Sequence, residues 1–230
     1  VEGPKWCGKT WTCENVAGSK YEVADPAGNF QNRQLAEIDP SGVLEGDTPR
    51  LIDEWQEVPG IWDAVRFAVD KIPEPGKFLL TGSSTPKRKG VHHSAAGRIA
   101  RLQMSTMTLY ESGDSCGLVS LLDLVDSSPK MVLTGDVTLK RLAEFIVRGG
   151  WPSQFRLKDR NHASLMAGEY LNALITDDLN RLDDKQRDIE KMKRLLRSLA
   201  RNESTTASIK LLNKDMESDD GRGMDADTIA

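Results

Sequence analysis

The first ten residues, Val1 to Thr10, read VEGPKWCGKT and decide the fold class of this chain. Gly3, Gly8, Lys9 and Thr10 fit the pattern G-x-x-x-x-G-K-T of a phosphate-binding loop. In such a loop the glycines let backbone N–H groups close around the phosphates, the lysine reaches the β- and γ-phosphates, and the threonine hydroxyl ligates Mg²⁺. The helix that follows points its positive end at the bound anion. The opening therefore predicts a loop that binds a nucleotide phosphate, followed by a helix.

A second element about forty residues downstream supports this interpretation. Leu51 and Ile52 form a short apolar run that ends in two carboxylates, Asp53 and Glu54. By themselves these acids would be ordinary surface residues at the end of a strand, and a glycine-rich chain start would be a frayed terminus. Together, the loop and the acidic strand end favour a nucleotide site.

The start of the chain carries an expectation of its own. A phosphate-binding loop normally follows a buried β-strand, and here only Val1 and Glu2 precede Gly3. The C-terminus also stops in mid-pattern at residues 227–230. We therefore expect the sequence to be a fragment of a longer protein.

Composition bounds the class of protein. A length of 230 residues suits one large domain or two small ones. The chain is 38% hydrophobic and 29% charged, which is an ordinary balance for a soluble globular protein. Its net charge of −4 provides no general attraction to nucleic acid or to anionic membranes. No apolar run approaches the ~20 residues that span a bilayer, so we expect no membrane partner.

The cysteines indicate the compartment. Cys7, Cys13 and Cys116 lack the spacing of metal ligands, and an odd, sparse count suits free thiols in a reducing cytoplasm. Cys7 lies inside the loop, where alkylation would block nucleotide binding. We favour the simpler interpretation that it is a spacer residue.

Strand-like and helix-like segments alternate in the first part of the chain. Pro59 and Gly60 open a helix in which apolar residues recur at helical spacing. The other expected elements are a helix over 9–18, strands over 21–24, 50–54 and 78–84, a weaker strand over 99–104, a turn over 25–28 and helical turns over 31–38. This order predicts an α/β fold, with the parallel sheet of a P-loop NTPase and flanking helices.

Beyond about Gly113 the pattern becomes helical. The expected helices cover residues 118–125, 137–147, 163–174, 186–201 and 208–216, and a further one starts at 224. The last two, joined by a polar turn, are typical of the start of a winged-helix unit. We expect three domains: an ATPase core over 1–135, a helical lid region over 136–200, and the start of the winged-helix domain over 201–230.

The chain resembles a bacterial and archaeal family of P-loop ATPases. The segments that carry the resemblance are residues 1–10, 49–56, 79–84, 97–99 and 148–152. In that family an AAA-type ATPase domain is followed by a C-terminal domain of unknown function, and its members are known mostly as ATP-binding proteins. Family proteins are also longer at both ends, in agreement with a fragment.

The resemblance implies roles for individual residues. Lys9 would hold the β- and γ-phosphates, Thr10 and Asp53 would hold Mg²⁺ directly or through water, and Glu54 would polarise the attacking water. Catalysis of this kind consists of positioning and neutralisation of charge. The residues assigned to nucleotide binding are Gly3, Pro4, Lys5, Trp6, Cys7, Gly8, Lys9, Thr10, Ser83 and Ser84. Ser83 or Ser84 would sense the γ-phosphate, although both also suit a turn at the end of a strand.

Arg98 is the first candidate for an arginine finger, ahead of Arg50 and Arg148. If it acts in trans, the active form is a homo-oligomer; the alternative is a solvated arginine at the start of a strand. We therefore expect a Mg²⁺-dependent ATPase. ATP is preferred over GTP on the resemblance, and the chain has no N-K-x-D motif for guanine.

The competing function is a nucleotide-dependent switch or a DNA-binding regulator with negligible turnover. Two basic segments suggest DNA as a partner. They are the loop at Lys87-Arg88-Lys89 and the basic face of the helix over 186–201. Most such segments are solvated. The acidic start of the last expected helix also disfavours contact with phosphate. A protein partner is expected but not identified.

Overall fold

The computed structural model describes residues 1–72, 74–83, 96–126, 131–132, 135–156, 160–178 and 188–220. The chain divides into two compact units, Val1–Ala163 and Ser164–Ala230, which we describe separately. The predicted domain boundaries at residues 135 and 200 remain predictions.

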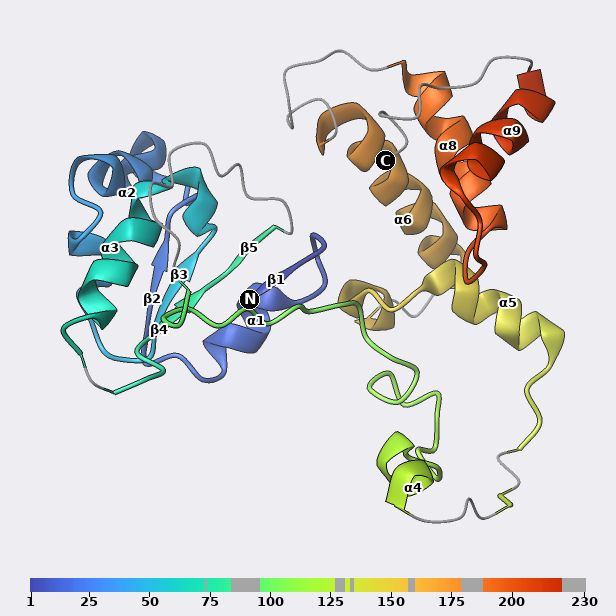
Figure 1. Cartoon of the computed structure of the whole chain (residues 1–230), viewed down its shortest axis with the longest axis horizontal. Helices are drawn as coiled ribbons and strands as arrows, with labels where there is room; N and C mark the ends of the chain where they lie inside the picture. Colours follow the sequence, from blue (N-terminus) through green and yellow to red (C-terminus); the bar gives the residue numbers. More distant parts are fainter. Residues whose placement is uncertain are drawn as a thin grey trace. The chain divides into compact units, whose positions relative to one another are not determined.

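The first unit contains the parallel sheet that the sequence predicts (Figure 1). Strand β2 (Ser19–Glu22) pairs with β3 (Arg50–Asp53), which pairs with β4 (Phe78–Leu80). A two-residue strand, β1 (Glu2–Gly3), pairs in parallel with β5 (Gly82–Ser83). The α/β class with parallel strands is therefore confirmed.

The two groups of strands are joined through Thr81, which links β4 to β5. Its backbone N–H donates to the carbonyl oxygen of Ile52 in β3 at 3.1 Å, and the N–H of Gly82 donates to the carbonyl of Val1 at 3.3 Å. The segment 78–83 therefore runs between the strand that ends in Asp53 and the strand that leads into the loop. Because the carboxyl ends of parallel strands meet at one edge, this order brings the loop and Asp53 together.

A short extended segment flanks β1 on its other side. The N–H of Glu2 donates to the carbonyl of Leu102 at 2.9 Å, and the N–H of Met104 donates to the carbonyl of Glu2 at 2.7 Å. The weak strand that we expected over 99–104 is thus present as a single parallel bridge to Gln103.

Helices cover the sheet on both sides. Helices α2 (Ala27–Ile38) and α3 (Gly60–Val69) pack on one face, and α1 (Lys9–Glu14) lies across the strands from them (Figure 1). The core between sheet, α2 and α3 consists of Val23, Ala36, Val43, Ile52, Trp55, Val58, Ile61, Trp62, Val65 and Leu80. Helix α1 is shorter than the predicted 9–18. The predicted break at 25–28 continues through Phe30, because Gly28, Asn29 and Phe30 all have left-handed backbone angles.

In the rest of the first unit, one carboxylate joins a helix to the segment that precedes it. It contains α4 (Leu121–Asp126), α5 (Leu139–Arg148) and a 3-10 helix (Pro152–Arg156). Asp114 accepts hydrogen bonds from Arg141 at 2.9 Å and from Arg148 at 2.6 Å, and so fixes α5 to the preceding segment.

Helix α6 (Arg160–Ala173) runs across the boundary into the second unit and continues as a π-helix (Leu174–Asp178). There α8 (Ile189–Arg201) packs against α9 (Ile209–Asp220) around a small core of Ile175, Met192, Leu195 and Met216. The fully buried hydroxyl of Ser198 donates to the carbonyl of Leu212 at 3.2 Å and joins the two helices.

The expectation of a winged-helix unit depends on a helix from residue 224, which lies outside the described residues, and it is not confirmed. None of the described helices has the length and the apolar character that a membrane crossing requires.

Candidate nucleotide-binding site

The predicted phosphate-binding loop joins β1 to α1 and has the backbone that its glycines require. Gly8 precedes α1 with φ 101°, a left-handed conformation that favours glycine. At Gly3, a Cβ atom would lie 2.2 Å from the carbonyl oxygen of Met104, so only glycine fits beside the flanking segment. Trp6 also has a positive φ, 63°, a strain that concentrates at functional sites.

Lys9 lies in the first turn of α1 and its side chain turns back into the loop. Its ammonium nitrogen donates to the carbonyl oxygens of Gly3 at 3.0 Å and Pro4 at 2.9 Å. Only 6% of the residue is exposed. A buried cation needs such partners, and these carbonyls hold it inside the curve of the loop.

Thr10 and Asp53 meet across the sheet edge, as the resemblance implies. The Thr10 hydroxyl donates to Oδ1 of Asp53 at 2.7 Å, and the Thr81 hydroxyl donates to the same oxygen. Carboxylate and hydroxyl oxygens are hard ligands that suit Mg²⁺, which commonly takes one or two carboxylates together with substrate phosphates. These residues therefore fit Mg²⁺, although no cluster of three or more His, Cys, Asp or Glu suited to a metal occurs in the described chain.

Glu54 follows Asp53 directly and leaves the strand with a left-handed backbone, φ 54° and ψ 44°. Its Oε2 accepts a hydrogen bond from Nε2 of Gln56. The side-chain oxygen of Gln56, Oε1, is buried and has no hydrogen-bond partner among the described residues. The carboxylate thus has a fixed place at the same strand end as Asp53.

The structure describes Ser83 and Ser84 only in part and places Arg98 beside a cavity that adjoins α3. Ser83 belongs to β5, but its side chain and the whole of Ser84 lie outside the described part of the chain, as does the basic loop at 87–89. Arg98 forms an ion pair with Asp70, the residue that follows α3, and lines a cavity of about 510 Å³ between α3 and residues 97–102. The described lining of that cavity includes none of residues 4–10.

The cysteine of the loop agrees with a spacer role. Cys7 is fully buried, and its sulfur would lie 3.2 Å from a Cβ atom on Gly3. Cys13, in α1, is also buried, and burial raises the pKa of its thiol.

Sequence reasoning missed Thr81, Gln56 and Pro152. Pro152 belongs to the segment 148–152, and its Cγ would lie 3.5 Å from a Cβ atom on Gly8. Thr81 is the more informative omission, because a polar residue that ends an apolar strand parallel to β3 must lie at the same edge as Asp53. That signal was present in the sequence, but it required the strand order.

Comparison with known families agrees with this architecture. Residues 1–112 match the family model of an AAA domain, and residues 139–229 match that of a domain of unknown function. The first match contains the loop, Asp53, Glu54 and Thr81.

Two curated relatives are uncharacterized proteins, one from Mycobacterium bovis and one from Mycobacterium tuberculosis. Each is 26% identical over 185 residues, which cover 79% of this chain and 36% of the relative. The matched region thus spans about a third of the length of these relatives. No solved structure matches the chain.

Proposed function

Because this chain belongs to the P-loop ATPases in which an AAA domain is followed by a domain of unknown function, we propose that it binds ATP with Mg²⁺ and hydrolyses it. The observation that carries the proposal is the hydrogen bond of 2.7 Å between Thr10 and Asp53. It joins the phosphate-binding loop to the acidic end of β3, which are the two halves of a site for a metal-bound phosphate chain.

In this proposal the loop binds the phosphates and Lys9 carries the main positive charge. Its ammonium exchanges carbonyls of the loop for oxygens of the β- and γ-phosphates, and the N-terminus of α1 adds the backbone N–H groups of its first turn. Thr10 and Asp53 would hold Mg²⁺, directly or through water, and there it would supply positive charge that offsets the charge of the phosphates.

Glu54 is the proposed catalytic carboxylate. It orients the attacking water and accepts its proton, and Gln56 holds one of its oxygens in place. Ser83 or Ser84 senses the γ-phosphate, since both follow the strand that lies beside β3.

Steady-state ATP turnover with Mg²⁺, measured beside nucleotide affinity, tests the proposal. We expect Glu54→Gln to bind ATP as the wild type does and to lose turnover. Glu57→Gln is the matched control, because Glu57 lies three residues further on and pairs with Arg33 at the surface. Retained turnover in Glu54→Gln would refute the catalytic assignment.

A second candidate is a nucleotide-dependent switch with negligible turnover. The ion pair between Arg98 and Asp70 favours it, because Arg98 must leave Asp70 before it can act as a finger. In this case ATP binds, but hydrolysis waits for an arginine supplied by a partner or by a second copy of the chain.

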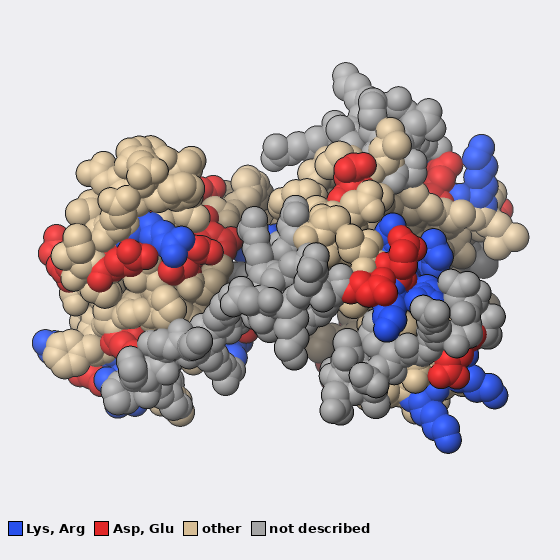
Figure 2. Space-filling model, turned by 90° about the horizontal axis from the view of Figure 1, so that it is seen from above, with Lys and Arg blue, Asp and Glu red and all other residues tan. Residues whose placement is uncertain are grey.

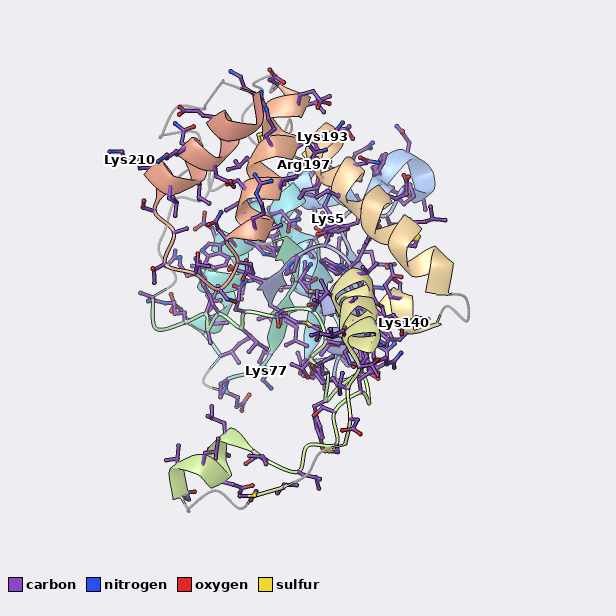
Figure 3. All side chains as sticks on the ribbon, turned by 90° about the vertical axis from the view of Figure 1, so that its right-hand side faces the viewer. Lys5, Lys77, Lys140, Lys193, Arg197 and Lys210 are labelled. Atoms are coloured by element: carbon purple, nitrogen blue, oxygen red, sulfur yellow. The ribbon has the colours of Figure 1, made fainter. Side chains whose placement is uncertain are left out.

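DNA binding receives less support. Lys193 and Arg197 lie one turn apart on α8 (Figure 3), but Lys193 pairs with Glu190 on the same helix. Among the described residues on the face in Figure 2, basic side chains lie beside acidic ones and do not form a continuous basic surface. A regulator that contacts DNA would use the C-terminal region, and retention on DNA that weakens with salt would reveal it.

The sparse free cysteines suit a cytoplasmic protein.

A further inference from the structure

Thr81 is a buried polar residue that the sequence assigns to no role. It lies between β4 and β5 with no exposed surface. Its neighbours in the chain are the apolar β4 and the glycine that starts β5. A threonine in such a place must satisfy its hydroxyl inside the protein, and it does so at the proposed metal site.

The backbone around Thr81 fixes where its hydroxyl points. Its N–H donates to the carbonyl of Ile52 at 3.1 Å, and its carbonyl accepts from the N–H of Trp55 at 3.2 Å. Asp53 lies between these two partners in the sequence. The sheet therefore holds Thr81 directly opposite the aspartate by two hydrogen bonds that do not involve side chains.

The contact between the side chains is specific. The Thr81 hydroxyl donates to Oδ1 of Asp53, and Thr10 donates to the same oxygen at 2.7 Å. Thr10 lies in the first turn of α1, directly after the loop, whereas Thr81 is held against β3 by backbone hydrogen bonds. Of the two donors, Thr81 is the one that lies outside the phosphate-binding motif.

We propose that Thr81 is a positioning residue for the Mg²⁺ site, where its hydroxyl fixes the rotation of the Asp53 carboxylate toward Thr10 and the metal. This rests on the proposed function. Groups that orient a metal ligand typically contribute 10- to 100-fold to metal affinity. Thr81 touches neither phosphate nor water in this role, so it affects the metal without affecting metal-free nucleotide binding.

The test is a titration of MgCl₂ at a fixed concentration of fluorescent methylanthraniloyl-ATP, followed by anisotropy, with a parallel measurement in EDTA. For Thr81→Val, which keeps the shape and removes the donor, we expect the Mg²⁺ concentration for half-maximal binding to rise about tenfold. Affinity in EDTA stays that of the wild type. Thr81→Ser keeps the hydroxyl and restores the Mg²⁺ dependence, and Thr12→Val, on the exposed side of α1, is the matched control.

A purely structural role gives a different pattern. Thr81→Val would then lower the unfolding temperature without nucleotide and leave the Mg²⁺ titration unchanged, a result that overturns the proposal while ATP binding stands. If Thr81→Val does not fold, Thr81→Ala is the second variant without a hydroxyl. Its Mg²⁺ titration and its unfolding temperature then decide between the two roles in the same way. A wild-type protein that binds no methylanthraniloyl-ATP with or without Mg²⁺ overturns the proposed function and this inference together.

Discussion

The ammonium nitrogen of Lys9 lies 3.0 Å from the carbonyl oxygen of Gly3, so the loop holds its own cation at the end of β1. The carbonyl of Pro4 accepts from the same nitrogen at 2.9 Å. The charge is thus placed before any nucleotide arrives, inside the curve of the loop. Because little side-chain freedom remains to be lost, this arrangement favours phosphate binding.

Lys9→Ala should abolish tight binding of ATP. The variant loses charge-assisted hydrogen bonds to phosphate, each worth about 1.5–3 kcal/mol, so we expect affinity to fall about 100-fold or more. Isothermal titration calorimetry with ATP and Mg²⁺ measures this. Lys71→Ala is the control, because Lys71 lies on the surface over Phe67 and its substitution removes the same positive charge outside the loop. Equal affinities in the two variants would show that Lys9 does not hold the phosphates.

The nucleotide site was more predictable than its surroundings. Thr10 starts the helix after the loop that follows β1, and Asp53 ends β3, so the meeting of strand ends in a parallel sheet brings them together. What the sequence did not reveal is that the segment 78–83 separates β1 from β3. Strand order depends on contacts between residues far apart in the chain, and without it Thr81 appeared to be part of an ordinary apolar strand.

In the helical regions, the sequence predicts the apolar face of a helix but not which of its residues are buried. The pattern of α8 places Ile189 and Leu199 on the apolar face with Met192 and Leu195, but both are about two-fifths exposed in the structure. Arg201 of α8 still pairs with Asp215 of α9, so the contact between the helices extends beyond Leu199. Periodicity within one helix cannot indicate which of its apolar positions a neighbouring helix covers. Ser198, by contrast, is fully buried because its hydroxyl has a partner on α9.

Gly150→Ala should destabilise the first unit. A Cβ at this position would lie 2.2 Å from the carbonyl oxygen of Met107, whose N–H donates to the Gly150 carbonyl at 2.8 Å. Since the obstacle is backbone, we expect a loss of about 1–3 kcal/mol in the free energy of unfolding, measured by urea denaturation. Gly168→Ala, with open space around its Cβ in α6, should be neutral or stabilising by up to about 1 kcal/mol. The reverse order of the two variants would contradict the close packing at Gly150.

Asp114 should make stability depend on pH in the acid range. The hydrogen bond from Arg148, with help from Ser112 and the charge of Arg141, holds the pKa of this carboxyl below its usual range. A lowered folded pKa means that the contribution is complete above the unfolded value of about 3.9 and disappears as pH falls through the folded pKa.

Asp114→Asn should therefore cost about 1.5–3 kcal/mol in the free energy of unfolding at pH 7. The difference from the wild type should shrink as pH falls below about 4. Urea denaturation at pH 7 and pH 3 measures both values, with the exposed Asp136→Asn as control. A difference that stays constant between the two pH values would show that the charge of Asp114 is not what holds α5.

Arg98 provides the test of catalysis in trans. It pairs with Asp70 in its own chain, and its side chain is 41% exposed, so a second copy can reach it. We expect Arg98→Ala to keep ATP affinity and to lower turnover by about 10³-fold, the lower end of the range for an arginine finger. Asp70→Asn removes the partner and leaves Arg98 in place, so it should not reduce turnover.

Mixing the variants then separates the two modes of action. If Arg98 acts on a neighbouring copy, Arg98→Ala combined with Glu54→Gln should recover turnover, because a mixed pair contains one site with both residues intact. Recovery should increase with total protein concentration, since it requires association. Full turnover by Arg98→Ala alone would show that Arg98 has no catalytic role and only forms a surface ion pair. Removal of that ion pair would then change the free energy of unfolding by less than about 1 kcal/mol.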